Sequence, residues 1–171
     1  MNEKAKAVRL MLFDVDGVMT DGGLHYSDSG EEIKVFNSRD GHGIKMLKAS
    51  GVKLAIITGR TSNALARRAA QFNVDYLYQG VEDKLAVFQE ILADANLTPE
   101  DCGYMGDDVV DLPVMRRVAF AVAVPDAPDL VRQYAHYVTG LPGGRGAVRE
   151  ICDLIMQVQG TLDASLAPYL R

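Results

Sequence analysis

Short apolar runs that alternate with longer segments of helical spacing constrain the fold of this chain more than any other feature. We expect strands at residues 8–13, 52–57, 75–78, 102–105 and 120–122, and helices at residues 41–50, 61–72, 83–95, 109–118 and 147–159. Strands and helices that alternate along a chain are typical of a parallel sheet covered by helices. The sequence therefore predicts an α/β fold.

The interval after the first expected strand breaks this alternation. A crossover helix is expected there, but residues 24–27 and 32–36 have strand-like composition, and Asp28-Ser29-Gly30 between them is a typical turn sequence. We therefore expect a β-hairpin flap at about residues 23–37, next to the carboxyl end of the first strand. Ligands bind at that edge of open α/β sheets, so the hairpin should overhang the ligand site.

The size and charge of the chain limit the remaining possibilities. Its 171 residues suit one compact domain, which we expect to span residues 1–171 with a C-terminal helix and tail at residues 147–171. The net charge is −5, with acidic and basic residues interspersed. Nucleic acid and anionic membranes are disfavoured as partners, because both would favour a basic face.

The cysteines and the N-terminal residues indicate the compartment. Cys102 and Cys152 lie far apart and belong to no CxxC motif or cysteine/histidine cluster, so we expect buried free thiols in a reducing environment. The first residues are charged and lead into only a short apolar stretch. Neither a signal peptide nor a span of about 20 apolar residues is recognisable. We therefore expect a cytoplasmic protein.

Asp14 and Asp16 directly follow the first apolar run. Alternation in a strand would place both acids on one side, and Gly17 indicates that the chain is already turning. Two like charges about 4 Å apart near a protein surface repel by roughly 4 kcal/mol, and a hard divalent cation with oxygen ligands removes that cost. A solvated turn is the alternative explanation of this motif taken alone.

A second acidic cluster, Asp107, Asp108 and Asp111, follows the strand expected at residues 102–105. Acids at a helix N-terminus also stabilise the helix, so this cluster alone is ambiguous. Each of the two clusters, however, follows a strand of the same expected parallel sheet. Together they predict one Mg²⁺ site.

Thr58 and Lys84 are the remaining candidates for chemistry. Thr58 ends an expected strand, where its hydroxyl and the following backbone N–H groups, beginning with Gly59, could hold phosphate oxygens. The alternative is a helix N-cap, although Thr61 and Ser62 are better placed for that. Lys84 begins an expected helix, where a lysine opposes the helix dipole. This unfavourable position suggests a functional role, although most lysines merely solvate a surface.

These motifs occur in a characteristic order: Asp-x-Asp, then a threonine, then a lysine, then Gly-Asp-Asp, across residues 14–111. In this order they resemble the haloacid dehalogenase superfamily. The resemblance implies a Rossmann-like three-layer sandwich and a Mg²⁺-dependent phosphatase. It also implies that a metal ion and Lys84 screen the approach of a carboxylate to a phosphate dianion.

The resemblance also implies a role for each motif residue. Asp14 is similar to the nucleophile that forms an aspartyl-phosphate. Asp16 is similar to the general acid and base, and its backbone carbonyl would also ligate Mg²⁺. Thr58 and Lys84 resemble the pair that holds the phosphate, and Asp107 resembles the remaining metal ligand.

Two further acids and one comparison complete this expectation. Asp108 and Asp111 resemble residues that support the metal or Lys84. Dehalogenase members of the superfamily lack the second aspartate of the first motif, which is present here as Asp16. The resemblance therefore favours a phosphatase.

The chain has little room for the cap domain that most relatives carry. Residues 16–40 hold only the expected hairpin, and residues 58–84 hold one helix and one strand. Capless enzymes need another way to exclude water, and oligomerisation is the expected one. The capless branch that this chain resembles is typically homotetrameric, so we expect hairpins or tails to cover neighbouring sites. The apolar tail residues Leu166, Pro168, Tyr169 and Leu170 could dock in this way, although termini usually fray.

The substrate is suggested by several longer matches. The segments DVDGVMTDG, FNSRDGHGI, GDDVVDLPVM and GGRGAVREICDLI resemble capless phosphatases that act on the 8-phosphate of an eight-carbon sugar acid in lipopolysaccharide synthesis. Gly59, Arg60, Gly144 and Arg145 are the expected substrate contacts, because arginine binds carboxylates in a bidentate manner. Arg60 could instead be a surface residue, and the glycine-rich loop a simple turn.

Three alternatives stay open from the sequence. The first is a phosphatase for the 9-phosphate of a nine-carbon sugar acid. The identity of residue 60, which is Arg60 here, is the simplest feature that distinguishes this substrate from the eight-carbon one. The second is a phospho-accepting signalling module, but its acceptor would follow the middle strand, where this chain has Thr58. The third is an inactive assembly subunit, which would have no need of mutually repelling carboxylates.

Overall fold

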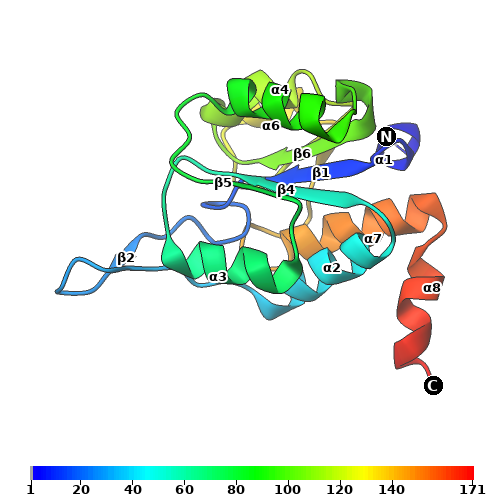
Figure 1. Ribbon diagram of the computed structural model, residues 1–171, viewed down its shortest axis with the longest axis horizontal. Coiled ribbons are helices and arrows are strands. Elements are labelled where there is room, and N and C mark those ends of the chain that lie inside the picture. Colours follow the sequence, from blue (N-terminus) through cyan, green and yellow to red (C-terminus); the bar gives the residue numbers. More distant parts are fainter. Residues whose placement is uncertain (1) are drawn as a thin grey trace.

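A six-stranded sheet forms the centre of the computed structural model, which describes residues 2–171. All its strands are parallel, in the order β5-β4-β1-β6-β7-β8. They are β1 (Leu10–Phe13), β4 (Lys53–Ile57), β5 (Tyr76–Tyr78), β6 (Cys102–Gly106), β7 (Phe120–Ala123) and β8 (Tyr137–Val138). Helices cover both faces of the sheet (Figure 1). The expected three-layer α/β fold is confirmed.

Strand β1 lies inside the sheet and is buried along its whole length. It pairs with β4 on one side and with β6 on the other. A parallel strand that is covered on both faces needs a continuous apolar run, which explains the sequence Leu-Met-Leu-Phe before Asp14. After β1, the chain adds β4 and β5 on one side of it and then adds β6, β7 and β8 on the other side. The boundary between β1 and β6 is therefore the switch point, where ligands bind in such sheets.

The helices form two layers. One layer contains α2 (Ser38–Ala49), α3 (Asn63–Phe72) and α7 (Ala147–Gln159), and the other contains α4 (Lys84–Ala95), α5 (Leu112–Met115) and α6 (Asp129–Tyr134) (Figure 1). Helices α2 and α7 pack side by side. Gly43 permits this close approach, because a Cβ there would lie 2.7 Å from Cδ of Arg149.

The structure corrects the helix expected at residues 109–118. A 3-10 turn, η2 (Val109–Asp111), leads instead into the four-residue helix α5. Asp108 and Asp111 cap this turn reciprocally, which stabilises a tight start rather than a long helix. Several short elements were not expected from the sequence, since each has too few residues to show a period. These are α1 (Asn2–Lys6), α6, β8, α8 (Leu162–Leu166) and η3 (Ala167–Tyr169). The 3-10 turn η1 (Pro99–Asp101) lies where a threonine followed by proline predicts the start of a turn.

The hairpin after β1 is present but shorter than expected. Its strands β2 (His25–Tyr26) and β3 (Glu32–Ile33) form an antiparallel pair that extends beyond the body of the molecule (Figure 1). Leu24, Tyr26, Ile33 and Val35 are large apolar side chains that it leaves exposed. A two-stranded ribbon with few packing partners sustains little regular pairing, which accounts for the short strands.

The C-terminal tail lies next to helix α2 of the same chain. The ring of Tyr169 meets the ring of His42 edge to face, with 5.2 Å between centroids. Tyr169 and Leu170 nevertheless remain 61% and 82% exposed, so docking of the tail on a neighbouring subunit stays a prediction. Both cysteines are buried and free, as expected.

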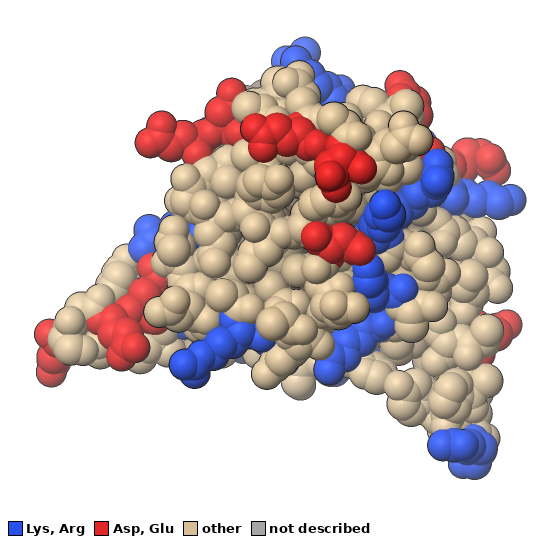
Figure 2. Space-filling model, in the orientation of Figure 1, with Lys and Arg blue, Asp and Glu red and all other residues tan. Residues whose placement is uncertain are grey.

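The surface carries both signs of charge. Figure 2 shows acidic side chains along the layer that contains α4 and on the hairpin, and basic side chains in the middle and lower parts of the same face. Within residues 2–171, no helix has the length and apolar character needed to cross a membrane.

Candidate active site

Three neighbouring strands each lead into a polar residue at the same edge of the sheet. Asp14 follows β1, Thr58 follows β4, and Asp107 follows β6. Because β1 pairs with both β4 and β6, the three strand ends lie side by side. They line a hollow of about 360 Å³ that also contains Asp16, Gly59, Arg60, Lys84 and Asp108. The structure thus brings most of the expected site residues together.

A larger hollow of about 480 Å³ lies between α2 and the C-terminal tail. Its ionisable lining is limited to His42, Lys45 and Tyr169, and the other residues are small or apolar. It therefore lacks the carboxylates that metal or phosphate chemistry requires. The chemistry belongs to the smaller hollow at the sheet edge.

Lys84 joins the two acidic motifs. Its Nζ lies 2.9 Å from Oδ1 of Asp14 and 2.7 Å from Oδ1 of Asp111, and all three side chains are buried. Asp83 caps helix α4 by accepting the N–H groups of Leu85 and Ala86, which fixes Lys84 as the first helical residue. Burial alone would lower the pKa of Lys84, but the two carboxylates raise it above its ordinary value. Lys84 therefore remains a cation.

Asp111 uses both carboxylate oxygens within the protein. Oδ1 accepts hydrogen bonds from Lys84 and from the hydroxyl of Tyr104, each at 2.7 Å. Oδ2 accepts the backbone N–H groups of Asp107 at 3.0 Å and Asp108 at 3.2 Å. Asp111 therefore holds the loop after β6 and fixes Lys84. Asp108 lies on the exposed rim of the hollow and accepts the N–H of Val109.

The carboxylates carry more negative charge than the protein itself neutralises. Burial and the neighbouring charge of Asp111 raise the pKa of Asp14 to about 6, even though Lys84 acts in the opposite direction. Burial, followed by the charges of Asp14 and Asp111, raises the pKa of Asp107 to about 8. Without a further cation, this cluster retains a proton near neutral pH.

These residues fit a divalent metal ion. One carboxylate oxygen from each of Asp14, Asp107 and Asp111 can be chosen so that all three lie within 4.8 Å of one another. Oxygen-only ligands are typical of hard cations such as Mg²⁺. The turn after Asp14 packs tightly on this set, because a Cβ on Gly17 would lie 2.1 Å from Oδ2 of Asp107. Because both carboxylate oxygens of Asp111 already accept two hydrogen bonds each, Asp14 and Asp107 are the better direct ligands.

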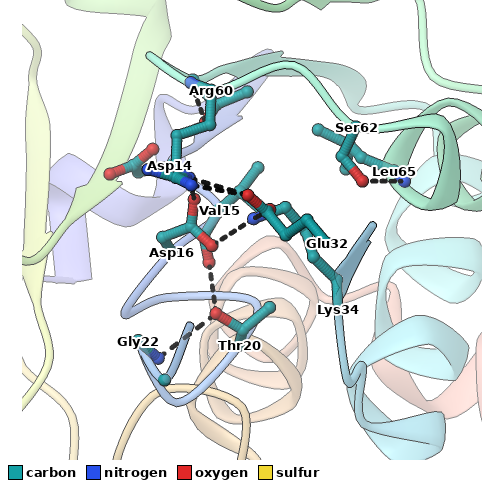
Figure 3. Close-up of polar contacts among 12 residues, drawn as sticks. Asp14, Val15, Asp16, Thr20, Gly22, Glu32, Lys34, Arg60, Ser62 and Leu65 are labelled. Carbon is teal, nitrogen blue, oxygen red and sulfur yellow. Dashed lines mark hydrogen bonds and ion pairs between the residues drawn. The ribbon is translucent and has the colours of Figure 1, made fainter. Parts of the chain in front are cut away.

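The hydroxyl of Thr58 is not used as a helix cap. Ser62 caps helix α3, and its Oγ accepts the N–H of Leu65 at 3.4 Å (Figure 3). The side chain of Thr58 is buried, and among residues 2–171 its Oγ1 accepts a hydrogen bond only from the N–H of Arg60, at 3.4 Å. The N-cap explanation of Thr58 is therefore excluded, and its hydroxyl stays free for a ligand beside the N–H of Gly59.

Asp16 and Arg60 are both bound by the hairpin (Figure 3). Nζ of Lys34 lies 2.5 Å from Oδ1 of Asp16. Nη2 of Arg60 lies 2.6 Å from Oε2 of Glu32. It also lies 2.5 Å from the hydroxyl of Tyr26. Hydrogen bonds from Arg60 and Lys34 lower the pKa of Glu32. Arg60 is thus ordered at the site rather than free on the surface.

Comparison with known proteins agrees with this geometry. Residues 65–149 match a family model for haloacid dehalogenase-like hydrolases. A 3-deoxy-D-manno-octulosonate 8-phosphate phosphatase from Yersinia pestis is 48% identical over 163 residues, which cover 95% of this chain and 87% of that protein. The chain belongs to the haloacid dehalogenase-like hydrolases.

Solved structures extend the likeness of this hydrolase to three dimensions. The Y. pestis phosphatase structure has a TM-score of 0.93 at 49% identity and covers 95% of this chain and 88% of its own. A 3-deoxy-D-manno-octulosonate 8-phosphate phosphatase from Moraxella catarrhalis, solved with a magnesium ion, a phosphate ion and a KDO molecule, has a TM-score of 0.96 at 39% identity. That match covers 98% of this chain and 97% of the other.

Two expected substrate contacts of this hydrolase lie elsewhere in the chain. Gly144 and Arg145 line a neighbouring hollow of about 290 Å³ together with Asp21. Arg145 pairs with Asp21 at 3.1 Å, and the N–H of Gly144 donates to the carbonyl of Val18 at 2.9 Å. Within one chain, the glycine-rich loop therefore supports the turn after β1. Contact of Gly144 and Arg145 with substrate stays a prediction.

Sequence reasoning missed four residues that shape the site: Tyr26, Glu32, Lys34 and Tyr104. The hairpin residues Glu32 and Lys34 are two positions apart, so strand alternation could have placed them on one face. Tyr104 lies in a fully buried strand of this hydrolase. A buried tyrosine hydroxyl needs a hydrogen-bond partner, which was the available signal for its contact with Asp111.

Proposed function

We propose that this chain is a Mg²⁺-dependent phosphatase that hydrolyses 3-deoxy-D-manno-octulosonate 8-phosphate to the free sugar acid and phosphate, in lipopolysaccharide synthesis. The observation that carries the proposal is the buried pair of Asp14 and Lys84 at the sheet edge, 2.9 Å apart. The relatives named for this reaction and the M. catarrhalis complex support the choice of substrate and metal.

The proposed reaction has two chemical steps, in which Asp14 and Asp16 have different roles. In the first, a carboxylate oxygen of Asp14 attacks phosphorus, the bond from phosphorus to the sugar oxygen breaks, and Asp16 gives that oxygen a proton. In the second, Asp16 takes a proton from water, and the water oxygen attacks the aspartyl-phosphate, which regenerates Asp14 and releases phosphate. Lys84, Thr58 and the N–H of Gly59 hold the phosphate oxygens throughout.

The proposed metal ligands are the carboxylates of Asp14 and Asp107 and the backbone carbonyl of Asp16. When bound, Mg²⁺ offsets the negative charge of the phosphate oxygens and of the attacking carboxylate. Asp108 and Asp111 are not proposed to bind the metal directly. Their proposed role is to hold the metal ligands or Lys84 in place. The raised pKa values of Asp14 and Asp107 support a cation at this position.

Arg60 is the proposed contact for the carboxylate of the sugar acid. It lines the same hollow as Asp14 and Asp16, and its side chain is 40% exposed, so it remains accessible to a ligand. A guanidinium binds a carboxylate with two parallel hydrogen bonds. Gly59 lies next to it, and we assign Gly144 and Arg145 to the substrate as well.

We further propose a cytoplasmic, single-domain protein that assembles as a homotetramer. The support is the hairpin, where Leu24, Tyr26, Ile33 and Val35 are exposed together. Exposed apolar patches on soluble proteins commonly mark interaction surfaces. Light scattering after gel filtration tests the assembly, and a double change of Ile33 and Val35 to serine should shift a tetramer towards smaller species.

The deciding experiment measures phosphate release from 3-deoxy-D-manno-octulosonate 8-phosphate with and without Mg²⁺. The matched control is Asp14→Asn, which preserves the shape of the side chain but removes the nucleophile. A substrate panel includes a nine-carbon sugar-acid 9-phosphate and simple alkyl phosphates. Mg²⁺-dependent turnover of the eight-carbon substrate that disappears in the control supports the proposal. Preference for another phosphate would retain the nucleophile and reject the substrate.

A further inference from the structure

We propose that Lys34 is a positioning residue for Asp16, and that it fixes which carboxylate oxygen Asp16 presents to the reacting phosphate ester. The inference rests on the proposed function, because the proton transfer by Asp16 belongs to that proposal. It adds the hairpin, as part of the same chain, to the machinery of the reaction.

The side chain of Lys34 is buried although the residue belongs to an exposed ribbon. Its side chain is 3% exposed, and its ammonium lies 2.5 Å from Oδ1 of Asp16 and 2.7 Å from Oε1 of Glu32 (Figure 3). Burying an ammonium is costly unless it is paired, and these two carboxylates provide the pairing. The position of Lys34 is therefore set by the site.

Strand alternation explains why the side chain of Lys34 points from the hairpin towards the site. Glu32 and Lys34 face the body of the protein, whereas the intervening Ile33 and the following Val35 are 52% and 63% exposed. Glu32 also binds Arg60, at 2.6 Å. Arg60, Glu32, Lys34 and Asp16 thus form one continuous series of ion pairs between the hairpin and the strand ends.

This series of ion pairs makes the two carboxylate oxygens of Asp16 inequivalent. Oδ1 is held by Lys34, whereas Oδ2 is buried and has no hydrogen-bond partner among residues 2–171. Nε of Arg60 lies 4.0 Å from Oδ2. A buried oxygen without a partner is costly, so Oδ2 is the oxygen left to exchange a proton with a ligand.

Proton transfer requires this kind of fixed geometry. A general acid must lie within hydrogen-bond reach of the leaving oxygen, and such transfer typically accelerates a reaction by about 10²–10⁴-fold. Without Lys34, the carboxylate of Asp16 can rotate and lose that alignment. The loss should matter for a sugar alkoxide, which must be protonated as it leaves. It should matter little for p-nitrophenolate, which leaves as a stable anion.

The experiment compares two substrates in the same variants. We expect Lys34→Met to reduce kcat/KM for the sugar-acid 8-phosphate by about 10–100-fold, which is less than the full effect of acid catalysis because Asp16 itself remains, and to change kcat/KM for p-nitrophenyl phosphate by less than about 3-fold. Lys34→Arg should restore part of the loss, because it returns the cation. Lys53→Met is the control, since Lys53 is exposed at the opposite end of β4. Thermal unfolding verifies that each variant is folded.

The outcomes separate this inference from the proposed function. Equal losses on both substrates would show that Lys34 merely supports the hollow, and unchanged rates on both would show that it does not act on Asp16. Either result overturns the inference. If the wild type rejects the eight-carbon substrate but cleaves other alkyl phosphates, the proposed substrate fails. The same comparison, made with the best alkyl phosphate, then still decides the role of Lys34.

Discussion

The ammonium of Lys84 lies 2.9 Å from Oδ1 of Asp14, in a place where the two side chains are only 5% and 9% exposed. A lysine at the first position of a helix opposes the helix dipole. Here that local cost is outweighed by two buried carboxylates, because Lys84 also contacts Asp111 at 2.7 Å. The pair therefore connects the stability of the protein to its chemistry.

Lys84→Met should weaken both properties. Removing one partner of a buried ion pair leaves an uncompensated charge, so we expect the free energy of unfolding to fall by about 3–5 kcal/mol. We expect kcat/KM to fall by about 10²–10³-fold, the typical effect of removing one group that stabilises transition-state charge. Urea unfolding and phosphate release measure the two effects. Lys45→Met, on the exposed face of α2, is the control, and equal stability of the two variants would contradict the prediction.

Asp14→Asn should abolish activity but stabilise the metal-free protein. The asparagine has the same shape and carries no charge, so it relieves both the burial of a charge and the repulsion by Asp111, which together raise the pKa of Asp14 to about 6. A gain of 1 kcal/mol corresponds to a rise of about 2–4 °C in Tm for a chain of this size. Calorimetry in the presence of a chelator measures it, with the exposed Asp126→Asn as control. A lower Tm for Asp14→Asn would show that the ion pair with Lys84 outweighs the repulsion.

The metal-free protein should lose stability as the pH rises from about 5 to about 8. Folding raises the pKa of Asp107 from its ordinary value of 3.8 to about 8, chiefly through burial, so the folded state binds more protons than the unfolded state in this window. Stability therefore decreases with increasing pH there. Folding lowers the pKa of other carboxyl groups, such as Glu32, and these groups make stability increase with pH. Their effect is confined to acidic pH, at and below the ordinary pKa of a carboxyl group.

Tm measured in a chelator at several pH values tests this slope. Mg²⁺ should stabilise the protein more at pH 8 than at pH 5, because protons compete with the metal for the carboxylates. Asp107→Asn should flatten the metal-free slope, since it removes the group responsible. A slope that stays the same in Asp107→Asn would assign the effect to other groups.

Gly17→Ala should weaken metal binding. Gly17 has a φ of +86°, and a Cβ there would lie 2.1 Å from Oδ2 of Asp107, so the alanine must displace a proposed metal ligand. We expect the affinity for Mg²⁺ to fall by about 10–100-fold, as is typical when the surroundings of a metal ligand are disturbed. Calorimetric titration measures this affinity.

Gly30→Ala provides a close control for that variant. Gly30 has a similar φ of +80°, but its Cβ would meet nothing within 4 Å. It therefore carries the same backbone strain without the collision. If both variants bind Mg²⁺ equally well, the packing of Gly17 on Asp107 does not govern the site.

The sequence by itself determined the sheet and the centre of the site. Three of the apolar runs lead into a residue with a recognisable chemical function, and a parallel sheet brings the ends of neighbouring strands to one edge whatever the loops do. For this reason Asp14, Thr58 and Asp107 could be expected together, and their strands follow the expected ranges. The helix expected at residues 109–118 was wrong, because the mutual capping of Asp108 and Asp111 favours a tight turn there.

Only the tertiary structure decided which side chains surround that centre. Whether Lys34 reaches Asp16 depends on where the hairpin packs, and the two residues are 18 positions apart. The bond from Tyr104 to Asp111 likewise needs the turn after β6 to fold back over its own strand. Arg145 is directed towards Asp21 by the packing of a distant loop. Periodicity determines which face a residue occupies, whereas the partners on that face come from segments whose approach is fixed only when the whole chain packs.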